Sequence, residues 1–234
     1  RVLVVGFGLV RAGPPAWYSL VVHVVRPLGA DLAIHTASAV PLYLERRATF
    51  LWPAFQGGYA AQVAECIDSL LGHGLASAQL LNHSWKSRKC FRSVFIPLSA
   101  DRRQIWSQMA GFELLAQQMD AWRIAERYAQ VIVTRLDHFH LVPHPWLNTS
   151  DEGIIFVPQG EDSYGINDRH VVLNARAASQ ALRTMHFLFD HAGGKAALCN
   201  HTMNPERLRL GTFVDHVGAK IRRSRTPNGV CVPY

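Results

Sequence analysis

The chain opens with Val2-Leu3-Val4-Val5-Gly6-Phe7-Gly8, a continuous apolar run that ends in a glycine-containing turn. Continuous apolar runs of this kind are typical of parallel strands that are buried on both faces. A helix is expected over residues 16–25, because Pro27 and Gly29 follow it, and a second strand is expected over 32–36. A strand, a helix and a strand in this order predict an α/β fold with a mostly parallel central sheet flanked by helices.

The later segments continue this alternation of strands and helices. Apolar residues between 104 and 128 recur at intervals of three and four, which is the period of a helix with one buried face. No internal repeat or linker divides the chain, so we expect one domain over residues 1–234. Strands are predicted at 94–96, 131–133, 154–157 and 170–173, helices at 59–71, 104–128, 175–188 and from Asn204 to near Gly218, and a basic strand at the end.

Composition excludes several classes of protein. The 234 residues are 49% apolar, which is enough to bury a core and excludes intrinsic disorder. No apolar run is long enough to span a bilayer. The chain begins at Arg1 without a leader, so we expect a mature form that meets a membrane only through a segment absent from this sequence. The net charge is +7, but no nucleic-acid recognition module accompanies it, so no nucleic-acid partner is expected.

Three N-x-S/T sequons bear on localisation. They begin at Asn82, Asn148 and Asn200, and none has proline in its middle position. They favour a glycoprotein of the secretory pathway, such as one in the Golgi lumen, with the cytoplasm as the alternative. The four cysteines are too widely spaced for a CxxC zinc site, and they permit three disulfide pairings or none.

The glycine turn after the first strand invites comparison with a dinucleotide-binding motif. The spacing of Gly6 and Gly8 fits the first half of G-x-G-x-x-G, but Arg11 stands at the third glycine. Pro14-Pro15 is expected to interrupt the helix that such a motif requires. We therefore do not expect a nicotinamide or flavin cofactor. Arg11 is well placed in the sequence to meet a diphosphate beyond the end of the first strand.

A second candidate site follows the strand at 131–133, where the sequence continues as Thr134-Arg135-Leu136-Asp137. Ligands of open α/β sheets bind at the carboxyl ends of the strands. A carboxylate there can hold Mg²⁺ or Mn²⁺ and help a diphosphate to leave. The alternative is that Arg135 and Asp137 form an ion pair at the surface, and the spacing alone leaves both interpretations open.

Histidines follow this element directly. His138, His140 and His144 could form a zinc or iron site, since imidazole binds both ions, although their spacing matches no standard ligand triad. A His-ligated metal-dependent hydrolase or oxygenase is therefore kept as an alternative function. His201 is a separate candidate that could share one ion with Asp137.

The order of these motifs resembles a family of small nucleotide-sugar-dependent glycosyltransferases of the GT-A type, found in algae, plants and large algal viruses. Members open with a strand, a small-residue turn and an arginine, followed by a second strand that ends in His-Thr. An Arg-x-Arg-x-Asp element, an acidic Asn-Asp-Arg segment and an Asn-Pro-Glu helix start come later. The matching residues here are 4–11, His35-Thr36, 133–137 with Val133 at the leading arginine, 156–158, 161–169 and 204–208.

The resemblance implies a GT-A-like domain with a donor-binding half over about 1–140 and an acceptor-binding half over about 141–234. It implies transfer of a sugar from a nucleoside diphosphate sugar to a glycan or protein-linked hydroxyl, helped by Mn²⁺ or Mg²⁺. The alternative is a non-catalytic sugar- or nucleotide-binding protein of the same fold. The implied roles are donor binding by Gly6, Gly8, Arg11, Thr36, Arg135 and Asp137, acceptor binding by Glu161, Tyr164, Asn167 and Arg169, catalysis by Asp168 or Asp162, and metal binding by Asp137 and His201.

Overall fold

The computed structural model describes residues 1–8, 10, 12–36, 39–51, 100–158, 169–183 and 220–224, with the backbone alone for 100–110 and 220–224. These residues form a seven-stranded sheet in the order β3-β2-β1-β4-β6-β5-β7. The strand β6 runs opposite to all the others. The strands are β1 (Val2–Phe7), β2 (Asp31–His35), β3 (Ala48–Leu51), β4 (Gln130–Arg135), β5 (Ile154–Pro158), β6 (His170–Asn174) and β7 (Lys220–Ser224).

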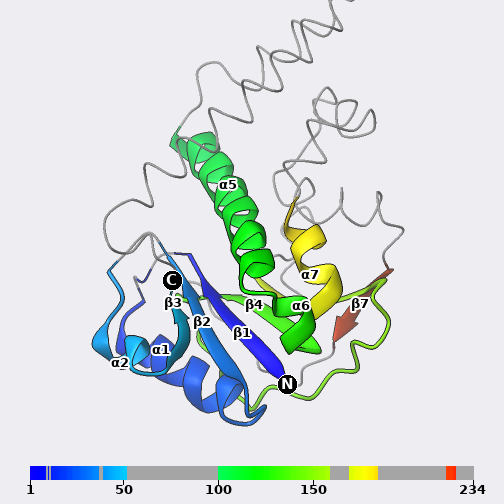
Figure 1. Cartoon of the computed structure of the whole chain (residues 1–234). Helices are drawn as coiled ribbons and strands as arrows, with labels where there is room; N and C mark the ends of the chain where they lie inside the picture. Colours follow the sequence, from blue (N-terminus) through cyan, green and yellow to red (C-terminus); the bar gives the residue numbers. More distant parts are fainter. Residues whose placement is uncertain are drawn as a thin grey trace, which may run out of the picture.

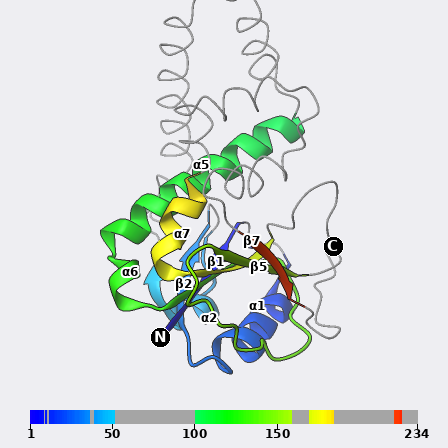
Figure 2. The same ribbon diagram turned by 90° about the vertical axis from the view of Figure 1, so that its right-hand side faces the viewer.

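Helices cover both faces of the sheet. Together with the parallel direction of every strand except β6, this confirms the α/β class and the mostly parallel sheet. Figures 1 and 2 show α5, α6 and α7 over one face, and α1 and α2 against the other. No helix within these described ranges is both long enough and apolar enough to cross a membrane. The helices are α1 (Pro14–Leu20), the π-helical turn η1 (Val21–Val25), α2 (Leu42–Glu45), α5 (Ala100–Ala121), α6 (Ile124–Arg127) and α7 (Ala175–Leu182).

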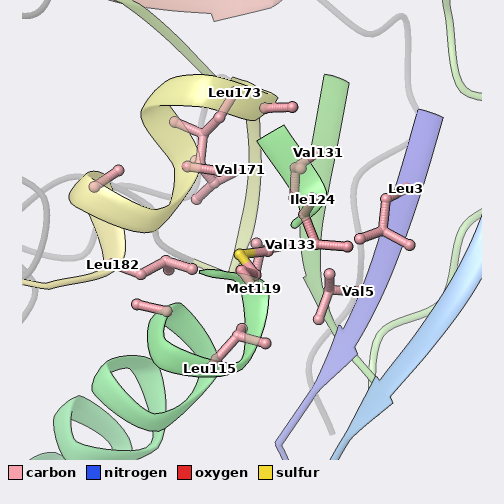
Figure 3. Close-up of a cluster of buried hydrophobic side chains, with 14 of the residues drawn as sticks. Leu3, Val5, Leu115, Met119, Ile124, Val131, Val133, Val171, Leu173 and Leu182 are labelled. Atoms are coloured by element: carbon pink, nitrogen blue, oxygen red, sulfur yellow. The ribbon is translucent and has the colours of Figure 1, made fainter. Parts of the chain in front are cut away.

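The inner strand β1 is buried along its whole length because its side chains alternate between two apolar clusters. Leu3 and Val5 pack with α5, α6 and α7, as Figure 3 shows, where Leu115 and Met119 of α5 reach toward the sheet. Val4 packs on the other face with α1 and η1. Full burial of each such side chain contributes roughly 1.5–3 kcal/mol to folding, so this alternation favours a position for β1 inside the sheet, between β2 and β4.

Several element boundaries differ from the sequence-based expectation. The first helix begins at Pro14 rather than at residue 16, because the first helical positions do not need the N–H that proline lacks. The helix expected over 104–128 is broken at Arg123, which adopts a left-handed conformation with φ 54°. The helix α7 ends at Leu182 and not at 188, since Arg183 leaves helical geometry. The sequence did not predict α2 and β3.

Other expected elements coincide with strands or fall outside the described residues. Strands were expected at 131–133, 154–157 and 170–173, and each of the three is present with slightly wider bounds. The basic strand near the carboxyl terminus is β7. The helices expected at 59–71 and from Asn204, and the strand expected at 94–96, lie outside the described residues.

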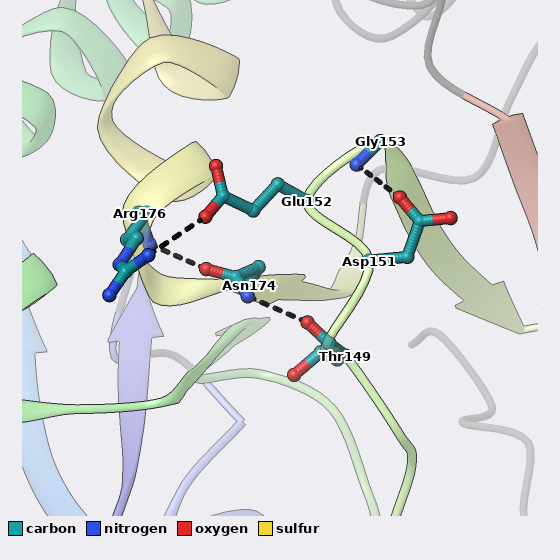
Figure 4. A network of polar contacts seen from close by, with 6 residues as sticks. All are labelled: Thr149, Asp151, Glu152, Gly153, Asn174 and Arg176. Carbon is teal, nitrogen blue, oxygen red and sulfur yellow. Dashed lines mark hydrogen bonds and ion pairs between the residues drawn. The ribbon is translucent and has the colours of Figure 1, made fainter.

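The segment between β4 and β5 is tied to the end of β6 by Asn174, as Figure 4 shows. The side-chain oxygen of Asn174 accepts a hydrogen bond from the backbone N–H of Arg176 at 2.8 Å, which caps α7. Its side-chain nitrogen donates to the carbonyl of Thr149 at 2.7 Å. One amide side chain therefore joins a helix start to the loop that leads into β5.

Asn174→Ala is expected to lower the free energy of unfolding by about 1–2 kcal/mol, because it removes the helix cap and the bond to Thr149 together. Asn174→Asp keeps the capping oxygen and loses only the donor, so its loss should be smaller. Urea denaturation of the three proteins checks this order. Equal stability of Asn174→Ala and the parent chain would contradict it.

Candidate functional site

The candidate site lies at the edge of the sheet where β1, β2 and β4 end. These three strands are neighbours and parallel, so their carboxyl ends share one edge. The chain places β2 and β3 on one side of β1 and β4 on the other, so the strand order reverses between β1 and β4. In open α/β sheets such a switch point is the place where ligands bind. Gly8 follows β1 there, Thr36 follows β2, and Asp137 follows β4.

Hydrogen bonds hold these strand ends together. The backbone N–H of Gly8 donates to the carbonyl of His35 at 3.2 Å, and that of Leu136 donates to the carbonyl of Phe7 at 3.0 Å. Gly8 has φ 95°, a left-handed conformation that favours glycine, and an added Cβ there would meet no atom of the described residues within 4 Å. The turn at Gly8 thus lies next to the carboxyl end of β4.

Gly6 has a different role from the one expected. The resemblance implies donor binding by Gly6, but the space beside Gly6 is filled by Leu136. A Cβ added at Gly6 would lie 2.4 Å from Cδ2 of Leu136 and 3.3 Å from Cδ1 of Ile34. Gly6 therefore allows the residue beside Asp137 to pack directly against β1.

Gly6→Ala is expected to lower the free energy of unfolding by about 1–3 kcal/mol, because the new methyl group displaces Leu136 from a well-packed position. Urea denaturation measures the loss. In the background of Leu136→Ala, which is itself destabilising, the substitution at Gly6 should lower stability by less because the obstructing side chain is gone. Additive losses in the double variant would show that the two residues do not compete for this space.

Arg135 and Asp137 form a two-pronged ion pair at the end of β4. Nε of Arg135 donates to Oδ1 of Asp137 at 2.7 Å, and Nη2 donates to Oδ2 at 2.6 Å. The Arg135 side chain is 28% exposed and the Asp137 side chain 10% exposed. A charge-assisted pair with two parallel bonds fixes the plane of the guanidinium. The ion-pair interpretation is therefore confirmed for these two residues, in a partly buried rather than a surface setting.

This pairing bears on the expected Mn²⁺ or Mg²⁺ at Asp137. Both carboxylate oxygens already accept from the guanidinium of Arg135. Among the residues that the structure describes, no three His, Cys, Asp or Glu side chains are arranged to hold a metal ion. Among the described residues Asp137 is therefore paired with Arg135 and belongs to no cluster of three ligands, and His201, the expected second ligand, lies outside the described residues.

Two buried histidines line the same edge. His35 ends β2 and stacks on Phe7, with ring centroids 5.3 Å apart, and burial lowers its pKa to about 3. The pKa of His138 is lowered to about 4, first by burial and then by the positive charges of Arg135 and Arg169, while Asp137 raises it. Both rings are therefore neutral at neutral pH. Three charged groups, two positive and one negative, surround His138.

Arg169 is brought to this edge, whereas sequence reasoning placed it with the acceptor. The backbone N–H of Arg135 donates to the carbonyl of Arg169 at 3.0 Å. Because β5 runs parallel to β4, Pro158 also ends at this edge, so both residues that flank 159–168 lie there. Of the predicted site residues, Gly6, Gly8, Thr36, Arg135, Asp137 and Arg169 are described, while Arg11, Glu161, Asp162, Tyr164, Asn167, Asp168 and His201 lie outside the described residues.

His140 and His144, which follow Asp137 in the sequence, pack against His170, a partner that sequence reasoning missed. His170, the first residue of β6, lies opposite Thr134 of β4. Nε2 of His144 lies 3.0 Å from Nε2 of His170, and the rings of His140 and His170 are 5.7 Å apart. The backbone N–H of His140 donates to Oγ of Ser19 in α1. No sequence signal linked His170 to this cluster, because only the antiparallel pairing of β6 brings it there.

Comparisons with known proteins add a structural similarity. The crystal structure of mouse xyloside xylosyltransferase 1 in its apo form resembles the chain with a TM-score of 0.46 and 10% sequence identity, over 95% of this chain and 84% of that one. No protein-family model and no curated protein sequence matches the chain.

Proposed function

We propose that this protein is a glycosyltransferase that binds a nucleoside diphosphate sugar at the edge between β1 and β4. One observation carries the proposal: the glycine turn after β1 and the Arg135–Asp137 pair after β4 meet at the switch point of the sheet. The motif order that resembles GT-A-type nucleotide-sugar glycosyltransferases supports this assignment. The proposed molecule is one GT-A-like domain with a donor half and an acceptor half.

The charges at this edge suit a diphosphate. Arg135 and Arg169 contribute two positive charges near His138, and Asp137 contributes one negative charge. The bidentate bond to Asp137 holds the Arg135 guanidinium in one orientation, so the cation is already in place before a ligand arrives. A fixed cation stabilises the negative charge that develops on a departing diphosphate. We include Arg11 in the proposal as a further cation because of its position in the sequence after the first strand.

The proposed reaction joins an acceptor hydroxyl to the anomeric carbon of the donor. A general base takes the hydroxyl proton, the oxygen bonds to the anomeric carbon, and the bond from that carbon to the diphosphate breaks. Asp168 is our choice for the base and Asp162 the second choice. Asp168 directly precedes Arg169, whose carbonyl accepts from the backbone of Arg135. Glu161, Tyr164 and Asn167 of the same segment are proposed to contact the acceptor, a glycan or glycoprotein.

A panel of UDP- and GDP-sugars tests the proposal, with Mn²⁺ and separately with a chelator. At least one donor should raise the melting temperature and release nucleoside diphosphate, because ligand that binds only the folded state stabilises it. A rise that needs Mn²⁺ would place a metal at the donor. Binding without release would identify a non-catalytic sugar- or nucleotide-binding protein, and no rise with any donor would refute the proposal.

A further inference from the structure

The segment that connects β4 to β5 crosses the edge of the sheet opposite to the candidate site. Nε2 of Gln130, the first residue of β4, donates to the carbonyl of Leu147 at 2.9 Å. Asn174, the last residue of β6, donates to the carbonyl of Thr149 at 2.7 Å. Asp137 lies beyond the other end of β4. The rise along a strand of this length is about 17 Å, so the two edges are well separated.

Asn148 stands on this segment as the first residue of the sequon Asn148-Thr149-Ser150. Thr149 is buried and bonded to Asn174, whereas Asn148 and Ser150 on either side of it are exposed. The backbone N–H of Ser150 donates to Oδ1 of Asn148 at 3.0 Å. The turn thus engages the oxygen of the Asn148 amide and not its nitrogen. Because a glycan is bulky and hydrophilic, a folded protein carries one on an asparagine that lies at its surface, and Asn148 meets that condition.

Trp146 adds a second, independent observation. Its side chain is 64% exposed, which is unusual for so large an apolar group, and it precedes Asn148 by two residues. Sugar rings have an apolar face of C–H groups, which can cover an aromatic ring and remove it from water. A sugar attached at Asn148 therefore offers a cover for an otherwise exposed indole.

We propose that Asn148 is a site of N-linked glycosylation and that the first sugars of its glycan pack on Trp146. The donor class is a lipid-linked oligosaccharide diphosphate, transferred by an enzyme of the secretory pathway. Nδ2 of Asn148 bonds to the anomeric carbon, the bond from that carbon to the diphosphate breaks, and the diphosphate leaves with the electron pair. The nitrogen loses one proton. Because the site faces away from Asp137, the glycan leaves the candidate site open, and the proposal does not depend on the proposed activity.

Glycopeptide mapping tests the modification. The chain is secreted from a eukaryotic host behind a cleavable leader and digested, and the peptide that contains Asn148 is analysed by mass spectrometry. We expect a glycan on this peptide, its loss in Ser150→Ala, and its retention in Ser150→Thr. Ser150 is exposed, so neither control disturbs the core. An unmodified Asn148 in the secreted, folded parent chain would overturn the proposal, and so would a glycan that survives Ser150→Ala.

A double-mutant cycle tests the packing on Trp146. Melting temperatures are measured for the secreted parent chain, Asn148→Gln, Trp146→Ala and the double variant. We expect Asn148→Gln to lower the melting temperature in the parent background and to lower it less when Trp146 is already absent. The same drop in both backgrounds would show that the glycan does not rest on the indole.

Discussion

Asp137→Asn is expected to reduce release of nucleoside diphosphate from the donor by about a hundredfold or more, the usual effect of losing one preorganised group at a reacting centre. The asparagine side chain offers Arg135 one acceptor oxygen in place of two, and its amide N–H groups repel the guanidinium. Arg135 then loses the orientation that meets the diphosphate. Single-turnover donor cleavage measures the change.

A remote ion pair supplies the matched control. Arg123, at the turn between α5 and α6, pairs with Glu126 of α6, and these side chains are 70% and 59% exposed. Glu126→Gln also exchanges a carboxylate for an amide next to an arginine, but it should leave donor cleavage unchanged. Arg135→Lys keeps the charge at the site and loses the two-pronged geometry, so its cleavage rate should fall as well. Parent-like cleavage in Asp137→Asn would remove Asp137 from the mechanism.

Acidification is expected to unfold the protein well above the pH at which carboxylates protonate. Burial lowers the pKa of His35 and His140 to about 3 and that of His138 to about 4, from 6.5. It also lowers the pKa of His144, and that of His170 well below 6.5. These rings stay neutral in the folded state while the unfolded chain takes up protons. Stability is therefore complete above about pH 6.5 and falls as the pH decreases toward 4.

The loss of stability on acidification depends on how many protons the chain takes up when it unfolds. Each group that protonates only on unfolding removes about 1.4 kcal/mol of stability per pH unit. His35, His138 and His140 together remove about 4 kcal/mol per unit, a large part of the roughly 5–15 kcal/mol that holds a typical domain together. Urea denaturation between pH 8 and pH 5 measures this slope. A flat profile over that range would contradict the burial of these rings.

His138→Phe removes one of the groups that take up a proton when the protein unfolds. Neither ring nitrogen of His138 has a hydrogen-bond partner in the part of the chain that the structure describes, so the substitution removes a titrating group and loses no bond found there. Its stability should fall with pH by about 1.4 kcal/mol per unit less than that of the parent chain. An unchanged slope would show that His138 is accessible to protons in the folded state.

The sequence predicted the centre of the fold because two strands carry their own signal. The apolar runs at Val2–Phe7 and Gln130–Arg135 can be buried on both faces only in the middle of a sheet, and they are neighbours there. The edge elements carried no such signal. Leu42–Glu45 is a single turn, and Ala48–Leu51 is four residues long and only partly buried. Arg123 breaks a helix without the glycine or proline that normally marks such a break.

The site could be predicted only in its sequence-local parts. Arg135 and Asp137 are two residues apart on one strand end, so their proximity follows from the sequence. The filling of the space at Gly6 by Leu136, and the approach of Arg169 to Arg135, depend on which strands become neighbours. Which strands become neighbours is decided by the fold of the whole chain and not by any local stretch of sequence. The local pattern therefore predicted the edge at which we propose the donor binds, but not the packing behind it.

Hydrogen–deuterium exchange with and without the nucleotide sugar that stabilises the chain most is the most direct test of the diphosphate site. We predict slower exchange in the peptides that carry Gly8 and residues 134–138, which end β1 and β4, and unchanged exchange around Asn148 at the opposite edge. Protection confined to another part of the chain, with none at these two strand ends, would contradict it.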